Sequence, residues 1–190
     1  MVSLLGASGS GKTTLLTATA RALDGRRRLG TLASGDGREA ERLRDAGIRA
    51  VSCSAPPGSV LDATTVARTL PQIVCADVDY VLVENRGMPC CPAVSDIGQA
   101  ATVVLLAATE DAQVRADPAS LRGADLVLIT KIDLRSGPAN GRDATAAALA
   151  ETVPSSCLLE ISSRTGEGLE AWVTWLRRQE IAIAPGPFRR

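Results

Sequence analysis

The stretch "GASGSGKT", residues 6–13, decides the fold of this 190-residue chain. It matches the pattern G-x-x-x-x-G-K-[ST] of a phosphate-binding loop. A strand-like apolar run, residues 2–5, precedes it, and a helix-like run, residues 12–23, follows it. Glycines let backbone N–H groups approach phosphate oxygens closely, and the N-terminus of the helix adds a positive dipole. The stretch therefore predicts a phosphate site between the first strand and the first helix.

The residue types in this loop predict separate roles. The ammonium of Lys12 would neutralise the β- and γ-phosphate oxygens, and the hydroxyl of Thr13 would ligate Mg²⁺. The remaining contacts would come from backbone N–H groups and short hydroxyl side chains. The expected phosphate-binding residues are Gly6, Ser8, Gly9, Ser10, Gly11, Lys12, Thr13 and Thr14.

A second motif, "ITKIDL" at residues 129–134, resembles the guanine-reading N-K-x-D pattern of GTPases, with Thr130 in place of Asn. The carboxylate of Asp133 can accept hydrogen bonds from both N1–H and the exocyclic amine of guanine, and the stem of Lys131 can lie over the base. Lys12 and Lys131 are the only lysines in the chain, whose other basic residues are all arginine. A strand end followed by a charged turn is the alternative interpretation of this stretch.

A third stretch, "ISSRTGEGL" at residues 161–169, resembles the S-A-K loop that closes over the base in GTPases. The resemblance rests on Ser162, Ser163 and Arg164. It would be weak alone, but its position after the second motif supports it. The sequence therefore predicts a guanine nucleotide as the ligand.

Two carboxylates follow strand-like runs and are candidates for the magnesium site. Glu84 ends the apolar run of "VDYVLVENRG", where a Walker B acid reaches Mg²⁺ directly or through water. Asp36 follows the second run, where it could orient a water molecule or complete the metal shell. Capping of the next helix is an equally ordinary role for Asp36. Lys12, Asp36 and Glu84 are thus the candidate catalytic residues.

Strand-like and helix-like runs alternate along the chain, as in βαβ units. The pattern predicts an α/β, three-layer P-loop NTPase fold, with a mostly parallel sheet of about seven strands covered by helices on both faces. We expect one GTPase domain over residues 1–180 and a C-terminal tail at 181–190. The expected strands are 2–5, 29–33, 48–53, 80–84, 102–107, 126–130 and 157–161. The expected helices are 12–23, 37–46, 61–70, 143–152 and 169–179.

The composition limits the possible partners and location. Lys plus Arg equals Asp plus Glu at 21 each, so no overall basic charge indicates nucleic-acid binding. No apolar run approaches the roughly 18 residues that span a bilayer, and the start lacks the features of a signal peptide. We therefore expect a soluble, cytoplasmic protein that acts on neither nucleic acid nor membrane. The five cysteines have no framework spacing, which favours free thiols in a reducing compartment.

These motifs, together with "SGDGREAERLRDAGI", "LDA" and "MPCCPAVSDIG", resemble the HypB family of nickel-insertion GTPases in hydrogenase maturation, and more distantly the urease accessory GTPases. The resemblance implies a fold of the SIMIBI class, GTP and GDP as ligands, Mg²⁺-dependent GTP hydrolysis and GTP-dependent homodimers. It also implies partners among metalloenzymes and their maturation factors. In the family, a metal site at the dimer interface uses a Cys-His pair before "LDA" and the Cys of "CPA", which corresponds to Cys91.

The chain departs from the family at this metal site. Ser59 and Val60 stand where the Cys-His pair is expected, and the chain contains no histidine. If two subunits met near this loop, Cys90 and Cys91 of each could supply four thiolates, a set that suits Zn²⁺ or Ni²⁺. The alternative is that both cysteines are small buried thiols. Redox switching is the least favoured reading, because a disulfide between neighbours would be strained.

Three other functions remain open from the sequence. One is an ATP-using small-molecule kinase of the same fold class, which would need an acceptor pocket and no base discrimination by Asp133. Another is a scaffold that binds nucleotide but hardly hydrolyses it. A third keeps the GTPase chemistry without a metal cargo, as the missing ligands at residues 59 and 60 allow.

Overall fold

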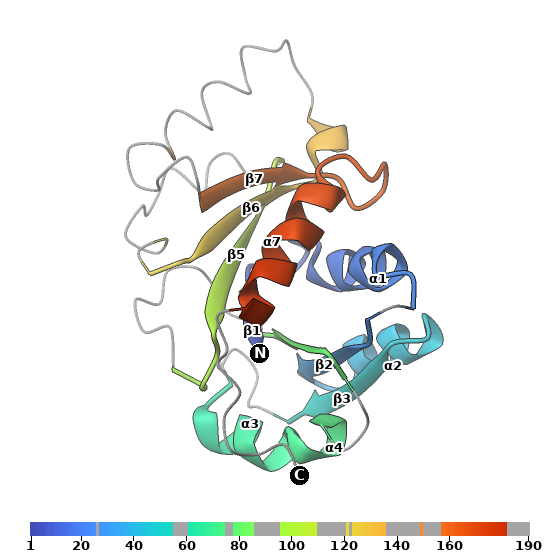
Figure 1. The fold of residues 1–190 in the computed structure, drawn as a ribbon, viewed down its shortest axis with the longest axis vertical. Coiled ribbons are helices and arrows are strands. Elements are labelled where there is room, and N and C mark those ends of the chain that lie inside the picture. Colours follow the sequence, from blue (N-terminus) through green and yellow to red (C-terminus); the bar gives the residue numbers. More distant parts are fainter. Residues whose placement is uncertain are drawn as a thin grey trace.

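The computed structural model describes residues 1–25, 27–54, 61–74, 78–85, 96–109, 121, 123–135, 149 and 157–181. Seven strands form one sheet in the order β3-β2-β4-β1-β5-β6-β7 (Figure 1). All of its pairings are parallel, so the predicted three-layer α/β fold is confirmed. The strands are β1 (Val2–Leu5), β2 (Leu29–Ser34), β3 (Arg49–Cys53), β4 (Tyr80–Glu84), β5 (Ala101–Ala107), β6 (Leu126–Thr130) and β7 (Leu158–Ile161).

Helices cover both faces of this sheet. On one face, a core of buried apolar side chains joins the strands to α1 (Lys12–Ala22), α2 (Arg38–Asp45) and α7 (Leu169–Ile181). On the other face, α3 (Ala63–Thr69) and α4 (Pro71–Val74) pack against β2 and β4 (Figure 1). The central strands β4 and β5 are buried along their whole length, as expected for strands between two helical layers.

The helix predicted at residues 61–70 is α3, and the short helix α4, which was not predicted, follows it directly. The side chain of Asp62 caps α3 by accepting a hydrogen bond from the N–H of Thr65 at 2.6 Å. Pro71 then begins α4. Because proline has no N–H to donate, it cannot continue α3 but suits the first turn of a new helix.

Two predicted segments lie mostly outside the described residues. Of the helix predicted at 143–152, only Leu149 is described, and it is buried. Helix α7 extends to Ile181, one residue past the predicted domain boundary, and the rest of the predicted tail is not described. In the described part of the chain, no helix is long and apolar enough to cross a membrane.

Helix α7 is fixed to α1 by a buried tryptophan. The side chain of Trp172 has no exposed surface, and its Nε1–H donates to Thr19 Oγ1 at 2.8 Å. The ring also stacks on Trp175, with the centroids 5.5 Å apart. Since α1 begins directly after the phosphate-binding loop, this contact links the C-terminal helix to the element that carries the candidate site.

Candidate nucleotide site

The phosphate-binding loop runs from the end of β1 to the start of α1, as the sequence predicted. A Cβ atom on Gly6 would lie 2.8 Å from the carbonyl oxygen of Leu105 on β5, so only glycine fits there. Gly11 has φ +92° at the N-cap of α1, a left-handed conformation that glycine adopts without strain. These two positions give the loop its tight curve.

The loop closes around the side chain of Lys12. Its Nζ donates to the carbonyl oxygens of Gly6 at 2.7 Å and Ala7 at 2.9 Å, and it lies 3.4 Å from Ser10 Oγ. Lys12 is only 5% exposed. The ammonium is therefore held within the loop by hydrogen bonds that it donates to backbone carbonyl oxygens.

Thr13 of the loop and Glu84 of β4, which are both predicted to ligate magnesium, are in direct contact. Thr13 Oγ1 donates to Glu84 Oε1 at 2.9 Å. Glu84 is the last residue of β4 and pairs with Leu4 of β1, which brings it beside the loop. It is 3% exposed. A hydroxyl and a buried carboxylate are hard oxygen ligands of the kind that Mg²⁺ prefers, so these two residues fit this ion.

The loop borders a cavity of about 390 Å³, which is also lined by two residues of α2, Glu39 and Arg42. The sequence analysis missed both. They stand three residues apart, next to the apolar face formed by Ala40 and Leu43, so helical periodicity could have placed them on one side of α2. The cavity is lined by Ser8, Gly9, Gly11, Lys12, Thr13, Thr14, Glu39, Arg42, Glu84 and Lys131.

Asp36 is not among the described residues that line this cavity. Its Oδ1 accepts the backbone N–H of Arg38 at 3.3 Å, and its Oδ2 lies 3.2 Å from Arg38 Nε. These contacts are at the start of α2 and favour the helix-capping interpretation. A place for Asp36 in the magnesium shell stays a prediction.

The second motif is joined to the phosphate-binding loop through Thr130. Its Oγ1 donates to the carbonyl oxygen of Ser10 at 2.6 Å and lies 3.2 Å from that of Leu106. The next residue, Lys131, has φ +58°, an uncommon conformation for a side chain with a Cβ atom. Lys131 borders the cavity beside the loop, together with residues at the start of α1.

The carboxylate of Asp133 is contacted by the third motif at both oxygens. Ser162 Oγ donates to Oδ1 at 2.5 Å, and Arg164 Nε donates to Oδ2 at 2.7 Å. These hydrogen bonds, that of Ser162 first, lower the pKa of Asp133 below its ordinary value. The side chain of Asp133 is 9% exposed, whereas that of Arg164 is 71% exposed. Asp133 is thus a preformed, ionised acceptor.

A second cavity, of about 140 Å³, lies beside the first, because Gly11, Thr14 and Lys131 line both. Its other lining residues are Thr130, Asp133, Leu134, Ser163 and Arg164. All the residues predicted to read the base therefore line it, except Ser162, which contacts Asp133. Leu134 is a large apolar side chain with 53% of its surface exposed. The first cavity is lined by the residues predicted to bind phosphate, and the adjoining one offers an apolar surface and a carboxylate.

Known proteins resemble this chain over most of its length. The hydrogenase maturation factor HypB of Azotobacter chroococcum is 35% identical over 186 residues, which cover 96% of this chain and 61% of that protein. The crystal structure of hydrogenase maturation factor HypB from Archaeoglobus fulgidus superposes with a TM-score of 0.80 at 30% identity, covering 94% of this chain and 89% of that one. The chain belongs to the HypB family.

A second HypB structure supports the fold. HypB from Helicobacter pylori, whose crystal structure is in complex with nickel, covers 100% of this chain and superposes with a TM-score of 0.82 at 22% identity. No model of a known protein family matches the chain. It spans about 61% of the length of the Azotobacter chroococcum HypB and 64% of the HypB of Escherichia coli K12.

The candidate transition-metal ligands of this HypB-family chain, Cys90 and Cys91, lie outside the described residues. So do Ser59 and Val60, which stand where the family resemblance implies a Cys-His pair. Within the residues that the structure describes, no group of three or more His, Cys, Asp or Glu could hold a metal ion. Cys53 is buried in the core, and burial raises the pKa of its thiol, which makes it a poor ligand.

Proposed function

We propose that this chain binds GTP and hydrolyses it in the presence of Mg²⁺, as a HypB-type maturation switch. The observation that carries the proposal is the position of Asp133, whose ionised carboxylate lies in a cavity beside the phosphate-binding loop. A guanine base there would present N1–H and its amine to the two carboxylate oxygens. Ser162 would keep Oδ1 oriented, and the exposed side chain of Arg164 would yield part of Oδ2.

The same geometry supports a role for the loop residues in hydrolysis. Lys12 would exchange its contacts with backbone carbonyl oxygens for phosphate oxygens, and backbone N–H groups would orient the γ-phosphate. Thr13 and Glu84 would hold Mg²⁺, which when bound supplies positive charge to the phosphates. Because the chain has no histidine, water activation would depend on a carboxylate or on positioning alone.

The biological role follows from the relatives and is also a proposal. Those relatives are named hydrogenase maturation factors, and one solved HypB structure contains nickel. We propose that this chain serves metal insertion into a metalloenzyme, acts through a GTP-dependent homodimer and consists of one GTPase domain over residues 1–180 with a short C-terminal tail. A cytoplasmic location stays a prediction.

A GTPase without a metal cargo is the second candidate function. It is favoured by Ser59 and Val60, which replace two of the three ligands that the family resemblance implies. Any metal site would then depend on Cys90 and Cys91, and either Ni²⁺ or Zn²⁺ would suit thiolates.

The test of the proposed activity is phosphate release from GTP and from ATP, measured with and without Mg²⁺ on the purified chain. We expect slow release from GTP that requires Mg²⁺, and little release from ATP. Equal use of ATP would instead support the small-molecule kinase. Tight GTP binding without phosphate release would support the non-hydrolysing scaffold.

A further inference from the structure

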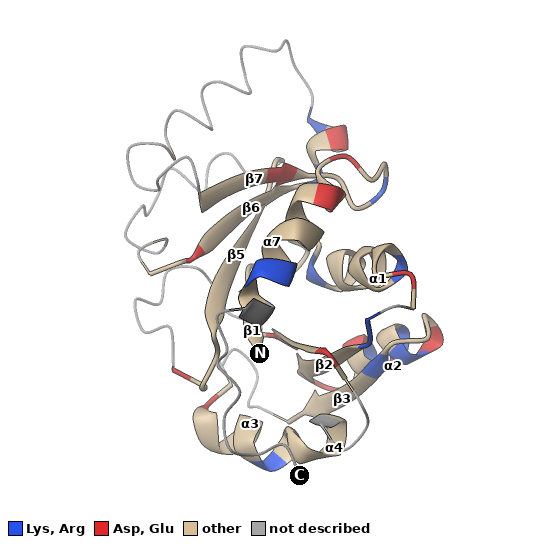
Figure 2. Ribbon diagram, in the orientation of Figure 1, with Lys and Arg blue, Asp and Glu red and all other residues tan. Residues whose placement is uncertain are grey.

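A partly buried ion pair lies next to the base-reading residues but lines neither cavity of the nucleotide site. Arg135 Nη2 donates to Glu160 Oε1 at 2.9 Å. Arg135 follows Asp133 by two residues, and Glu160 precedes Ser162 by two residues. Since Ser162 Oγ donates to Asp133 Oδ1, the same two segments are joined at two neighbouring points. Figure 2 shows charged residues where the end of β7 lies beside the short 3₁₀ helix that follows β6.

The carboxylate partner of this ion pair belongs to a strand. Parallel pairing in β7 places Glu160 opposite Ile129 of β6. The carbonyl oxygen of Glu160 also packs so closely against Gly168 that it leaves no room for a Cβ atom there. The backbone of Glu160 is therefore held by the sheet and by the start of α7.

The turn that carries Asp133 lies beyond the paired part of the sheet. The pairing of β6 with β7 ends at Thr130, and the 3₁₀ helix follows at Ile132–Leu134. The buried side chain of Ile132 anchors the start of this turn in the core. At its far end, the N–H of Arg135 makes only a long hydrogen bond of 3.3 Å to the carbonyl oxygen of Ile132. The contact of that end with β7 is made by the side chain of Arg135.

The two ion pairs around this turn differ in burial. The side chains of Arg135 and Glu160 are 13% and 31% exposed, whereas that of Arg164, which pairs with Asp133, is 71% exposed. Water and salt screen a partly buried ion pair less than an exposed one, and removal of one partner leaves the other charge poorly solvated. The pair of Arg135 with Glu160 is therefore the more persistent contact, whereas Arg164 can move aside when a base binds.

We propose that Arg135 and Glu160 are positioning residues for guanine recognition, because their ion pair holds the far end of the turn against β7 and so keeps the carboxylate of Asp133 beside Ser162. Neither side chain would touch the base, since neither lines the base cavity. The inference rests on the proposed binding of a guanine nucleotide. Loss of either partner should impair selection of the base and leave phosphate binding intact.

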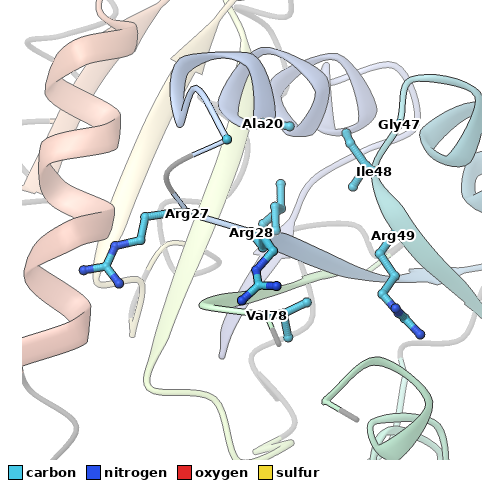
Figure 3. A pocket seen from close by; sticks show the side chains of 9 residues that line it. Ala20, Arg27, Arg28, Gly47, Ile48, Arg49 and Val78 are labelled. Atoms are coloured by element: carbon cyan, nitrogen blue, oxygen red, sulfur yellow. The ribbon is translucent and has the colours of Figure 1, made fainter. Parts of the chain in front are cut away.

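The variants Arg135→Gln and Glu160→Gln each remove one partner of the ion pair and keep a polar side chain. The control is Arg27→Gln, which breaks the ion pair of Arg27 with Asp79, 3.3 Å apart. Figure 3 shows Arg27 at a cavity of about 460 Å³ where β2 and β3 begin, whereas the phosphate-binding loop follows the end of β1. Because the strands are parallel, this control loses an arginine ion pair at the opposite end of the sheet from the base site.

Calorimetric titration with Mg²⁺ present measures the affinities for GTP, ATP and inorganic triphosphate. GTP affinity should fall about tenfold in each variant, because Asp133 loses its fixed orientation. Binding of ATP and triphosphate should stay close to that of the parent chain, since the phosphate-binding loop is intact. The double variant Arg135→Gln/Glu160→Gln should lose no more than either single variant, because all three remove the same contact. The control should bind all three ligands like the parent chain.

A carbon-13 NMR titration of the Asp133 carboxyl group separates positioning from a direct effect of charge. If the ion pair positions this carboxylate, both single variants should raise its pKa, because the hydrogen bond from Ser162 that lowers the pKa is weakened. A direct charge effect would instead raise the pKa in Arg135→Gln and lower it in Glu160→Gln. Such opposite shifts would overturn the proposal.

Equal losses of GTP and triphosphate affinity, or a GTP-to-ATP preference that both variants leave unchanged, would also overturn it. So would losses of GTP affinity that add in the double variant. Circular dichroism checks the fold of each variant, and if Arg135→Gln does not fold, Arg135→Lys replaces it, with a smaller loss confined to GTP. If the parent chain itself does not prefer GTP, the proposed function fails. The Asp133 titration needs no nucleotide and still decides whether the ion pair positions this carboxylate.

Discussion

Lys12 shows what a single residue contributes to this site. The motif predicts its charge and its place in the loop, but not that its ammonium is buried between the carbonyl oxygens of Gly6 and Ala7. Asp133 is similar, since the sequence predicts the carboxylate and tertiary structure adds its contacts with Ser162 and Arg164. Residue types in a motif are therefore predictable, whereas partners that come from distant segments are not.

Replacement of Lys12 by alanine should reduce GTP affinity by roughly tenfold to a hundredfold, because one charged hydrogen-bond donor to the phosphates is lost. The fold should remain, since the loop backbone is fixed by Gly6 and Gly11. Calorimetric titration with GTP measures the affinity, and Arg177→Ala on α7 serves as a control. Unchanged affinity and turnover in Lys12→Ala would show that the loop does not bind phosphate.

The contribution of Asp133 to the stability of the folded chain depends on pH, because its pKa is lowered. Hydrogen bonds that favour the ionised form stabilise the folded chain above the unfolded-state pKa of about 3.9, and this contribution is lost as pH falls through the lower folded-state pKa. A carbon-13 NMR titration of the carboxyl group measures the pKa directly. Ser162→Ala should raise it toward the ordinary value, because the first cause of the shift is removed. An identical titration curve in the variant would contradict this cause.

Among the secondary-structure elements, the strands and long helices were predicted well, and the segments that connect them were predicted less well. The strands 80–84 and 126–130 have the predicted bounds, because continuous apolar runs between turn signals leave few alternatives. The end of α3 lies within one residue of the prediction, whereas the short helix α4 that begins at Pro71 was not predicted. Glu39 and Arg42 were missed because only the packing of α2 beside the loop brings them to the cavity.

The junction of β7 and α7 depends on Gly168. A Cβ atom there would lie 2.0 Å from the carbonyl oxygen of Glu160, and the residue has φ +75°. Gly166 has φ +85° but nothing within 4 Å of its Cβ position, so it is a matched control for backbone strain alone. We expect Gly166→Ala to lower the free energy of unfolding by about 1–2 kcal/mol, and Gly168→Ala to lower it by more.

Urea denaturation of both variants measures this difference. Equal losses of unfolding free energy would mean that the contact with Glu160 adds nothing to the cost of strain. Because the loop between β7 and α7 carries Ser162 and Arg164, Gly168→Ala should also weaken GTP binding.

For the whole molecule, the sheet and both helical layers follow from the order of strands and helices, and the HypB structures share them. A homodimer and a shared transition-metal site would depend on contacts with a second chain, which the order of strands and helices does not predict. Ser59, Val60, Cys90 and Cys91 lie outside the described residues, and a site shared between subunits depends on a second chain.

Titration of reduced protein with Ni²⁺ and Zn²⁺ tests the shared cysteine site. Four thiolates from two chains should bind one ion per dimer, more tightly with a non-hydrolysable GTP analogue and less tightly as pH falls, since thiolates become protonated. Cys91→Ala should abolish this binding. One tightly bound ion per monomer that is insensitive to Cys91→Ala would refute the shared site, and no binding at all would favour the GTPase without cargo.

The most direct test of a guanine-nucleotide site is competition among GTP, ATP and XTP for the parent chain and for Asp133→Asn. The parent chain should bind GTP far more tightly than ATP or XTP, because only guanine offers two donors to the Asp133 carboxylate. Asp133→Asn should lose GTP affinity and gain XTP affinity, since its amide N–H can donate to the carbonyl that xanthine has in place of the amine. ATP binding as tight as GTP binding in the parent chain, or a GTP preference unchanged by Asp133→Asn, would contradict the assignment.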